Sequence, residues 1–253
     1  MVSINYLTYF FSPLWKKIQK IPNLAEKEIQ VYFQNFEPSF LEYKENILSL
    51  QELERGEKFL QEKDKEFFLF GRILLRWILG RLLQVEPSCL EFENNPFGKP
   101  YLPKYPELEF NLSHSHGKYL VACNWKEPLG IDIEMIRPRL DYESLARRYF
   151  SVHEIKEYEG IPMELQELAF FSGWTRKEAY IKACGKGLAL PLKDFSLSLD
   201  PRNKSIIIKK DKDSCFLPLS LLSFYPYPSF LGALVFHNSK LTIKFFSLSS
   251  IYL

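Results

Sequence analysis

The stretch WTRKEAYIKACGKGL, residues 174–188, decides the fold because it predicts how a long helix ends beside a group of charged residues. Gly185 stands where a left-handed C-cap would end a helix, and Gly187 leaves the next loop without a Cβ atom. The stretch therefore predicts the end of a helix over residues 163–184. Residues four apart share one face of this helix: Phe170, Trp174, Glu178 and Lys182.

Glu178 and Lys182 alone are compatible with an ordinary surface ion pair, since such pairs support many helices. A second acidic pair upstream changes this interpretation. Residues 131–135 alternate apolar side chains with Asp132 and Glu134, so a strand there places both carboxylates on one face. Two such carboxylates repel unless water or a cation neutralises them. Together with Glu178 they predict a site for a hard divalent cation such as Mg²⁺, and a solvent-facing strand is the alternative.

The periodicity of the remaining segments predicts an α+β protein of two lobes, residues 1–125 and 126–253, although no strict sequence repeat is present. Ser151 is a predicted N-cap. Strands are predicted over residues 26–36, 108–112, 118–124, 131–135, 204–209, 215–224, 230–236 and 241–248. Helices are predicted over 142–150, 152–158 and 163–184, with two helices or one bent helix over 49–83.

The composition indicates a globular protein and argues against several classes of function. Of the 253 residues, 46% are hydrophobic, which is enough to bury a sizeable core. The 33 basic and 31 acidic residues nearly balance, so we expect no nucleic-acid partner. The four widely spaced cysteines favour free thiols over a zinc site or a disulfide framework. Neither a signal peptide nor a bilayer-length apolar run is evident, so we expect a cytoplasmic protein with no membrane partner.

The loop at residues 94–100 offers a cation in a turn-rich setting. Gly98 permits close approach of the backbone, Lys99 supplies a point charge and Pro100 stiffens the exit. An ordinary surface loop is an equally good interpretation of this segment. On the predicted helix before it, Arg76 lies among large apolar residues, so we expect its side chain to be held toward an anion.

Small polar side chains follow the predicted strand at residues 108–112. Ser113 and His114 at such a strand end can hold a phosphate. His114 and His116 can also ligate a metal, but no third ligand is evident nearby in the sequence. Carboxylates for a metal, surrounded by cations, are what phosphoryl or phosphodiester chemistry requires.

Four motifs follow one another along the chain: GKP at 98–100, FNLSHS at 110–115, GIDIE at 130–134 and FxxWxxKEAxxKxxGKGL at 171–188. In this order and spacing they resemble the 4′-phosphopantetheinyl transferases of the Sfp type, a superfamily that includes Gsp, HetI and AcpT. The helix that bears Gly71 and Arg76 extends the likeness upstream. Only the first forty or so residues have no counterpart.

The resemblance implies two similar lobes in a pseudo-twofold arrangement, with coenzyme A in the cleft between them. The implied activity is that of a holo-acyl-carrier-protein synthase, with coenzyme A as co-substrate. Its 4′-phosphopantetheine arm would be transferred to a serine hydroxyl of an apo acyl or peptidyl carrier protein, and adenosine 3′,5′-bisphosphate would be released. The implied cofactor is Mg²⁺, with Mn²⁺ as a substitute, and we expect a monomer.

The resemblance also implies a role for each matching residue. Asp132, Glu134 and Glu178 would hold the metal, and Glu178 would also be the general base toward the carrier serine. Lys182 would neutralise the pyrophosphate and assist the leaving group. The other implied contacts to coenzyme A come from Lys177, Lys99, Ser113, His114 and Arg76, with Gly98 and Pro100 shaping the loop. We expect Trp174 to anchor the helix in the core.

The chain departs from the family pattern in the first lobe. Glu52 and Arg55 stand where relatives carry basic residues that touch the 3′-phosphate, and Phe67 and Phe68 replace small or basic polar residues. These changes leave the predicted metal site intact. They put in doubt the grip on the 3′-phosphate and the part that Arg55 takes in it.

Two other functions use the same residues. The first is a Mg²⁺-dependent phosphodiesterase or nuclease, for which the near-neutral charge provides no basic stripe. The second is a non-catalytic module that binds coenzyme A or a carrier protein, which the intact acids and Lys182 disfavour. Residues 136–140 and the loop at Lys186 are candidate contacts for an acidic carrier helix, and solvated loops are the equal alternative. The pathway served, whether fatty acid, polyketide or peptide synthesis, is not encoded in these motifs.

Overall fold

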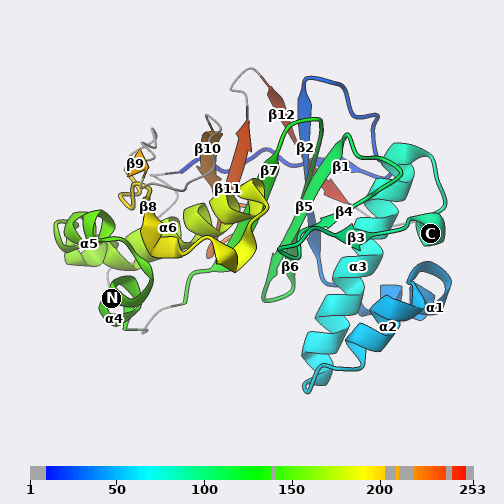
Figure 1. The fold of residues 1–253 in the computed structure, drawn as a ribbon, viewed down its shortest axis with the longest axis horizontal. Coiled ribbons are helices and arrows are strands. Elements are labelled where there is room, and N and C mark those ends of the chain that lie inside the picture. The colour runs from blue at the N-terminus through cyan, green and yellow to red at the C-terminus, as the bar shows by residue number, and fades with distance from the viewer. Residues whose placement is uncertain (1–9, 138–140, 203–208, 211–218, 238–240, 249–253) are drawn as a thin grey trace.

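The computed structural model describes residues 10–137, 141–202, 209–210, 219–237 and 241–248. Within them the chain forms a five-stranded and a three-stranded sheet flanked by helices, which confirms the α+β class (Figure 1). The helices are α1 (Lys44–Ile47), α2 (Leu50–Gly56), α3 (Glu62–Leu83), α4 (Tyr142–Tyr149), α5 (Val152–Glu159) and α6 (Met163–Cys184). Short 3₁₀ turns cover Pro38–Tyr43, Pro87–Cys89, Gly187–Ala189 and Leu192–Asp194.

The strands fall into two larger sheets and two short pairs in the described part of the chain. The first sheet has the order β1-β12-β2-β6-β5, and the second has the order β10-β11-β7. The short pairs are β3 with β4 and β8 with β9. The bounds are β1 (Lys16–Ile18), β2 (Glu28–Asn35), β3 (Glu93–Asn94), β4 (Pro100–Tyr101), β5 (Leu108–Ser115), β6 (Lys118–Trp125), β7 (Leu129–Met135), β8 (Phe195–Ser196), β9 (Lys209–Lys210), β10 (Leu219–Phe224), β11 (Phe230–His237) and β12 (Thr242–Leu248).

Most of the predicted elements are present. The segment 49–83 forms two separate helices, α2 and α3, rather than one bent helix. Ser151 caps α5 in a capping box with Glu154, and Gly185 ends α6 with a φ of 65° in the left-handed region. Of the predicted strand at 204–209, only residue 209 is described, and it lies in β9. Of the predicted strand at 215–224, residues 219–224 are described, and they form β10.

Strand β12 belongs to the second predicted half of the chain but pairs with strands of the first half. β12 runs parallel to β2 and joins the first sheet, where it also pairs with β1. The local hydrophobic pattern predicts a strand here but does not identify its partner. The segment before β1 also contacts the C-terminal part of the chain, because Trp15 Nε1 donates to the Pro226 carbonyl. The described residues before position 40 therefore help to join the two halves.

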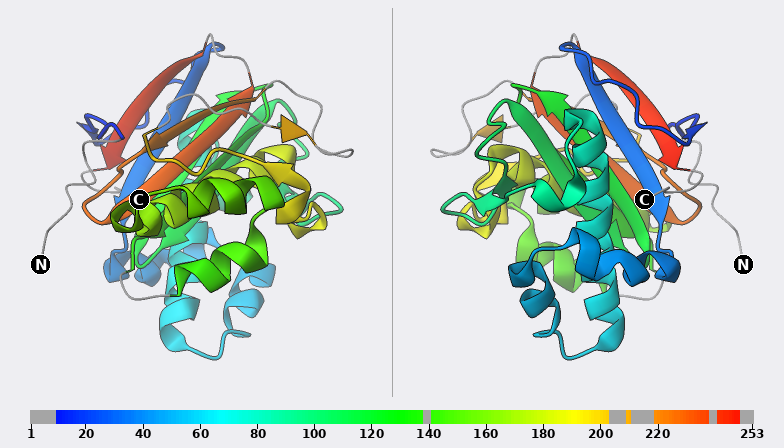
Figure 2. Two further views of the ribbon diagram at one scale, coloured as in Figure 1. Left: turned by 90° about the vertical axis from the view of Figure 1, so that its left-hand side faces the viewer. Right: turned by 90° about the vertical axis from the view of Figure 1, so that its right-hand side faces the viewer.

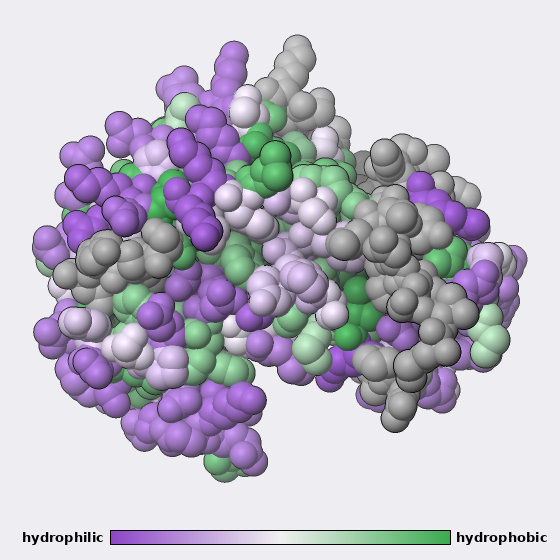
Figure 3. All heavy atoms as spheres, turned by 180° about the vertical axis from the view of Figure 1, so that it is seen from behind, coloured by the Kyte–Doolittle hydropathy of each residue, from purple (hydrophilic) through white to green (hydrophobic). Residues whose placement is uncertain are grey.

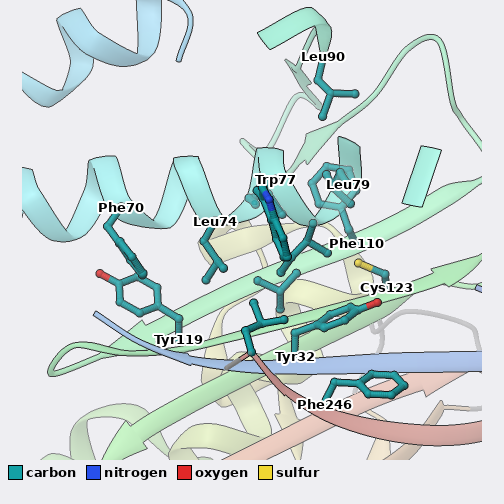
Figure 4. Close-up of a cluster of buried hydrophobic side chains, with 14 of the residues drawn as sticks. Tyr32, Phe70, Leu74, Trp77, Leu79, Leu90, Phe110, Tyr119, Cys123 and Phe246 are labelled. Atoms are coloured by element: carbon teal, nitrogen blue, oxygen red, sulfur yellow. The ribbon is translucent and has the colours of Figure 1, made fainter. Parts of the chain in front are cut away.

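Helix α3 packs on one face of the first sheet. Its apolar residues recur at the spacing of a buried helical stripe, with Phe70, Leu74 and Trp77 all almost fully buried. Figure 4 shows these side chains pointing toward the strands, where they meet aromatic residues such as Tyr32 and Tyr119. Two bulky layers thus interlock and hold α3 across the sheet.

The two larger sheets face each other through a second apolar layer. Ile29, Val31 and Phe33 alternate along β2 and meet Ile131 and Ile133 of β7. Because both faces of these central strands are covered, the layers run α3, first sheet, second sheet, α6. Figure 2 shows α3 (cyan) in front of the first sheet in the right-hand view, and the helices of the second half in front of the other sheet in the left-hand view.

The outer surface mixes residue types. On the coloured part of the face in Figure 3, hydrophobic and hydrophilic residues are interspersed, as is usual for surface exposed to water. None of the described helices combines the length and the apolar character needed to cross a membrane. Cys89 and Cys123 are free thiols, as expected, and Cys215 lies outside the described residues.

Helix α6 approaches β7 unusually closely, and Gly130 makes this possible. A Cβ atom at Gly130 would lie 2.1 Å from the Ala179 carbonyl oxygen and 2.4 Å from the Ala183 nitrogen. Both contacts are with helix backbone, which cannot rotate away. The close approach brings Asp132, two residues further along β7, within hydrogen-bond distance of Lys182 on α6.

We predict that Gly130→Ala lowers the free energy of unfolding by at least about 2 kcal/mol, because the added methyl group forces β7 and α6 apart. Equilibrium urea unfolding measures the loss. Gly160→Ala is the matched control, since its φ is −84° and its nearest neighbour would be 3.5 Å away. The control should change stability by less than about 0.5 kcal/mol. A Gly130→Ala variant as stable as the wild type would contradict the close approach.

Candidate active site

An open pocket of about 500 Å³ lies where β5, β7 and α6 meet. We call it the carboxylate pocket, and its lining is Leu112, Ser113, His114, Asp132, Glu134, Trp174, Glu178 and Lys182. Strand β7 supplies residues two apart and α6 supplies residues four apart, so each of these elements turns one face to the pocket, whereas β5 contributes three consecutive residues. All eight of these residues come from three of the four sequence motifs, and Trp174 also packs against the neighbouring apolar core.

The carboxylate pocket rests on contacts between the free edges of the two larger sheets. Side chains at alternate positions of β5 reach across to β7. Asn111 Oδ1 accepts from the Ile131 N–H at 2.8 Å, and Ser113 Oγ donates to Asp132 Oδ1 at 2.8 Å. Further along, Ser115 Oγ donates to Glu134 Oε2 at 3.0 Å. These bonds fix the register of the two edges where the acids stand.

Asp132 is the most buried of the three acids, with 3% of its surface exposed. Its Oδ1 accepts from Lys182 Nζ at 2.7 Å as well as from Ser113. Lys182 Nζ also donates to Ser113 Oγ at 3.0 Å. The second oxygen, Oδ2, is buried and has no hydrogen-bond partner. A buried carboxylate oxygen without a partner is costly, so this atom calls for a cationic or hydrogen-bonding ligand.

The other two acids are half-buried and experience the charge of Asp132. Burial, and then the negative charge of Asp132, raise the pKa of Glu134 to about 7 against the opposing hydrogen bond from Ser115. The same two causes raise the pKa of Glu178 above its ordinary value, and Lys182 opposes them. One lysine therefore does not neutralise the three carboxylates.

The three acids fit a divalent cation by their chemistry. In the part of the chain that the structure describes, no three His, Cys, Asp or Glu side chains already form a compact metal cluster. The pocket nevertheless brings three carboxylates to one cavity, with one orphaned oxygen on Asp132 and two elevated pKa values. Oxygen-only ligands of this kind suit Mg²⁺, which also retains water ligands.

His114 stands at the mouth of the carboxylate pocket. Its ring stacks on Tyr119, with ring centroids 5.2 Å apart. Desolvation and then the charge of Lys182 lower the pKa of His114, so the ring is neutral at pH 7. A neutral imidazole can still donate one hydrogen bond to an anion.

Lys99 lies in a neighbouring pocket of about 340 Å³ rather than in the carboxylate pocket. Its ammonium group donates to Glu109 Oε2 at 3.1 Å and to the Leu129 carbonyl at 3.2 Å. Gly98 of the same loop has a φ of 89°, which favours glycine, and Pro100 begins β4. The loop is tied to the end of α6, since Asn95 Nδ2 donates to the Gly185 carbonyl at 2.7 Å.

The structure corrects the expected role of Lys177. This side chain is 0% exposed and forms an ion pair with Glu154 Oε2 at 2.9 Å. Its ammonium group also donates to the Leu192 and Phe195 carbonyls. Lys177 therefore joins α6 to α5 and to the following loop, and it does not face the carboxylate pocket. Position 177 is only one residue from Glu178, but a step of one around a helix turns a side chain by about 100°.

Arg76 is 2% exposed and is held toward an anion, as expected, but that anion belongs to the protein itself. Its Nε donates to Glu52 Oε2 at 2.7 Å, and its Nη1 donates to the Pro87 and Leu90 carbonyls. Arg72 forms a second ion pair with Glu52. The anion toward which Arg76 is held is thus Glu52. An acidic residue at position 52 is explained by these two ion pairs, in which it balances the charges of Arg72 and Arg76.

The remaining departures from the family pattern form an aromatic group beside α2. The guanidinium of Arg55 lies 5.3 Å from the centroid of the Phe68 ring. The Phe67 ring packs against Phe36, with Lys63 above it. Arg55 is exposed and outside the carboxylate pocket, so the structure does not bring it together with the three acids.

Sequence reasoning missed Ser115, Gly130 and the buried partner Glu154. Ser115 has a detectable signal, because it lies two residues from Ser113 and therefore on the same face of the strand. The packing of Gly130 against α6 and the pairing of Glu154 with Lys177 have no local signal, since each depends on a neighbour far away in the sequence.

A pocket that brings three acids and one lysine together at the contact of two sheets suits phosphoryl-transfer chemistry, and comparison with known proteins gives the family of the chain. Residues 34–126 match the family model described as "4'-phosphopantetheinyl transferase, N-terminal", and residues 128–224 match "4'-phosphopantetheinyl transferase superfamily". The chain belongs to the 4′-phosphopantetheinyl transferases of the Sfp type, as the motifs predicted.

Similar curated proteins carry the same enzyme name. The 4′-phosphopantetheinyl transferase HetI of Nostoc sp. is 37% identical over 195 residues, covering 72% of this chain and 82% of HetI. Sfp of Bacillus subtilis is 33% identical over 173 residues, covering 68% of this chain and 76% of Sfp. The L-aminoadipate-semialdehyde dehydrogenase-phosphopantetheinyl transferase of Pongo abelii is 29% identical over 182 residues, covering 67% of this chain and 59% of that protein.

The buried cluster around Glu52 predicts a stability that depends on pH. Burial alone would raise the pKa of Glu52, but the charges of Arg72 and Arg76 outweigh it and lower the pKa below its ordinary value. The pKa of Glu52 is therefore lower in the folded state than in the unfolded state. The stabilisation that its ionised carboxylate provides is complete above about pH 4.5 and is lost as pH falls through the folded pKa.

We predict that Glu52→Gln lowers the free energy of unfolding by roughly 3 kcal/mol at pH 7, because it leaves Arg76 buried without its anion. Urea unfolding of wild type and variant between pH 7 and pH 3 measures the difference, which should shrink at the acidic end. Glu54→Gln, an exposed acid on the same helix, is the control and should change little. A Glu52→Gln loss that stays constant with pH would contradict the ionised role of Glu52.

Proposed function

We propose that this enzyme transfers the 4′-phosphopantetheine arm of coenzyme A to a serine hydroxyl of an apo acyl or peptidyl carrier protein. The single observation that supports this most is the carboxylate pocket, in which Asp132, Glu134, Glu178 and Lys182 converge from two strands and a helix. In the reaction, the serine oxygen bonds to the phosphorus that carries the pantetheine arm. The bond from that phosphorus to the bridging oxygen breaks, and adenosine 3′,5′-bisphosphate leaves with the bridging oxygen.

Asp132, Glu134 and Glu178 would together hold Mg²⁺ or Mn²⁺. When bound, the ion supplies Lewis-acid stabilisation of charge on the pyrophosphate oxygens. Asp132 offers its orphaned Oδ2, because Oδ1 is already engaged by Ser113 and Lys182. Burial first and then the charge of Asp132 raise the pKa values of Glu134 and Glu178, and a bound cation would oppose both effects.

Glu178 is the proposed general base. It lies on α6 one turn before Lys182 and lines the carboxylate pocket. Its raised pKa, caused first by burial, makes its carboxylate a better proton acceptor than an exposed glutamate. The proton of the carrier serine would pass to this carboxylate, directly or through a water molecule.

Lys182 would stabilise the charge that develops on the leaving group. Its ammonium group is partly exposed to the pocket while Asp132 and Ser113 hold it in place. An ammonium group fixed before the reaction needs no reorganisation when charge develops, which makes such a group effective.

The nucleotide end of coenzyme A would extend toward His114 and the loop that carries Lys99. The Ser113 hydroxyl already donates to Asp132, so His114 has the better placed donor, while Ser113 shapes this end of the pocket. Gly98 and Pro100 would hold the loop in position. For Lys99 to contact a phosphate, its ammonium group would turn away from Glu109.

A pseudo-twofold relation between residues 1–125 and 126–253 is supported by the order of their elements. The first half runs β2, α3, β5, β6 and its sheet has the order β2-β6-β5. The second half runs β7, α6, β10, β11 and its sheet has the order β7-β11-β10. Helices α3 and α6 both have 22 residues. On this basis we propose two lobes, and we assign β12 to the second lobe in sequence and to the sheet of the first lobe in space.

The proposed acceptor is a carrier protein that presents its serine on an acidic helix to a monomeric enzyme. Arg137 is exposed just beyond Glu134, and Lys186 follows the end of α6, so both flank the carboxylate pocket in sequence. Residues 138–140 of the predicted contact segment lie outside the described residues. The exposed Arg137 and the half-buried Lys186 would offer an acidic helix complementary charge.

We predict that an apo carrier protein incubated with this enzyme, coenzyme A and Mg²⁺ gains the mass of one phosphopantetheine arm, and that EDTA prevents the gain. Intact-mass spectrometry measures it. Glu178→Gln should lower the rate at least about 100-fold, because both a metal ligand and the base are lost, without a large change in melting temperature. Glu164→Gln, an exposed acid on the same helix, is the matched control and should keep the wild-type rate.

The other outcomes separate the competing functions. Binding of coenzyme A without transfer to carriers of several classes would favour a binding module. Cleavage of the coenzyme A pyrophosphate without modification of any carrier would favour a phosphodiesterase. Full transfer by Glu178→Gln would exclude Glu178 as the base.

A further inference from the structure

Ser115 is the last residue of β5 and lies where the edge of the first sheet meets β7. It is 6% exposed, and its side chain reaches Glu134 across the contact. Its Oγ lies 3.0 Å from Glu134 Oε2, 3.2 Å from the Met135 nitrogen and 3.1 Å from His116 Nδ1. No role in the proposed reaction has so far been given to Ser115 or to His116.

The three contacts match the capacity of one hydroxyl group, which has one proton to donate and two lone pairs to accept. The Met135 N–H can only donate, so it occupies one lone pair. An ionised Glu134 can only accept, so it takes the hydroxyl proton. The remaining contact then requires His116 to donate from Nδ1, which assigns the proton of the neutral ring to that atom. With Glu134 ionised, as it would be when bound to a cation, all three bonds form together only in this arrangement.

The arrangement leaves Glu134 held at one oxygen. The Ser115 hydroxyl bonds to Oε2 and leaves Oε1 to other partners. Glu134 lines the carboxylate pocket, so Oε1 is the oxygen that it can offer there. The same pattern occurs two residues back on both strands, where Ser113 holds Asp132 at Oδ1 and Oδ2 stays unpaired. Each β7 carboxylate is thus fixed by a β5 serine at one oxygen and offers the other to the pocket.

We propose that Ser115, locked in orientation by His116, is a positioning residue that aims Glu134 at the divalent cation. The inference rests on the proposed function, since it assumes that Glu134 is a metal ligand. A hydrogen bond to a ligating carboxylate restricts its rotation and thereby lowers the entropy lost on metal binding. Partners of this kind commonly change metal affinity by about 10- to 100-fold when they are removed.

The test is Mn²⁺ binding to the full-length protein in the presence of saturating coenzyme A, measured by electron paramagnetic resonance of free Mn²⁺. Ser115→Ala should raise the dissociation constant for Mn²⁺ about 10-fold or more. In the transfer assay the same variant should show a raised KM for Mn²⁺, while kcat at saturating Mn²⁺ stays within a few-fold of the wild type. A defect that extra metal overcomes is not expected from a purely structural role.

Asn111→Ala is the matched control. It removes a bond from the same strand to the β7 backbone, but Asn111 touches no carboxylate. It should lower the melting temperature and leave the dissociation constant for Mn²⁺ unchanged. If Ser115→Ala does not fold, Ser115→Cys is the second variant, because it keeps the shape of the side chain and replaces a strong donor with a weak one. It should also weaken Mn²⁺ binding.

His116 has a φ of 47°, in the left-handed region that asparagine tolerates better than most residues. His116→Asn should therefore keep the turn, lose the ring donor and weaken Mn²⁺ binding less than Ser115→Ala does. Wild-type Mn²⁺ affinity in both Ser115 variants would overturn the proposal while leaving the proposed function intact. A wild-type protein that binds no Mn²⁺ at all would overturn both.

Discussion

The bond between Lys182 and Asp132 is the interaction on which the rest of the site depends. A carboxylate as buried as that of Asp132 is costly without a cation and hydrogen bonds, and it receives both from other elements. Lys182 comes from α6 and Ser113 from β5, so one carboxylate unites a strand from each sheet with the long helix. This meeting is sterically feasible because Gly130 lets α6 lie directly on β7. The register of the sheets and the position of the helix are therefore set by the same few atoms.

Two lysines on α6 show how the same chemistry serves different ends. Lys177 and Glu154 form a fully buried pair whose remaining hydrogen bonds are made by loop carbonyls and by a helix cap. That pair joins elements together and leaves nothing for a ligand. Lys182 shares its pocket with three acids, of which two have raised pKa values and one has an orphaned oxygen. The unbalanced negative charge is what distinguishes a site for a cation from a structural ion pair.

How much of this could be predicted depends on the range of the interaction concerned. Periods of two and four residues are local. They correctly predicted that Asp132 and Glu134 share one face of a strand and that Glu178 and Lys182 share one face of a helix. The family motifs then predicted that these two faces belong to the same site. The partners of Lys177 and Arg76 could not be predicted, because Glu154 and Glu52 lie 23 and 24 residues away and are identified only by tertiary packing. The pairing of β12 with the first sheet is of the same kind, because a strand pattern does not name its neighbour.

The central claim is that the three acids form one cation site at the contact between the sheets. Its most direct test is a crystal structure of the protein with coenzyme A and Mn²⁺, with data collected at the manganese absorption edge. The account predicts one strong anomalous peak in the carboxylate pocket, within direct-ligand distance of Asp132 Oδ2, Glu134 and Glu178. A peak elsewhere, or bound coenzyme A whose pyrophosphate contacts none of these acids through an ion, would contradict it.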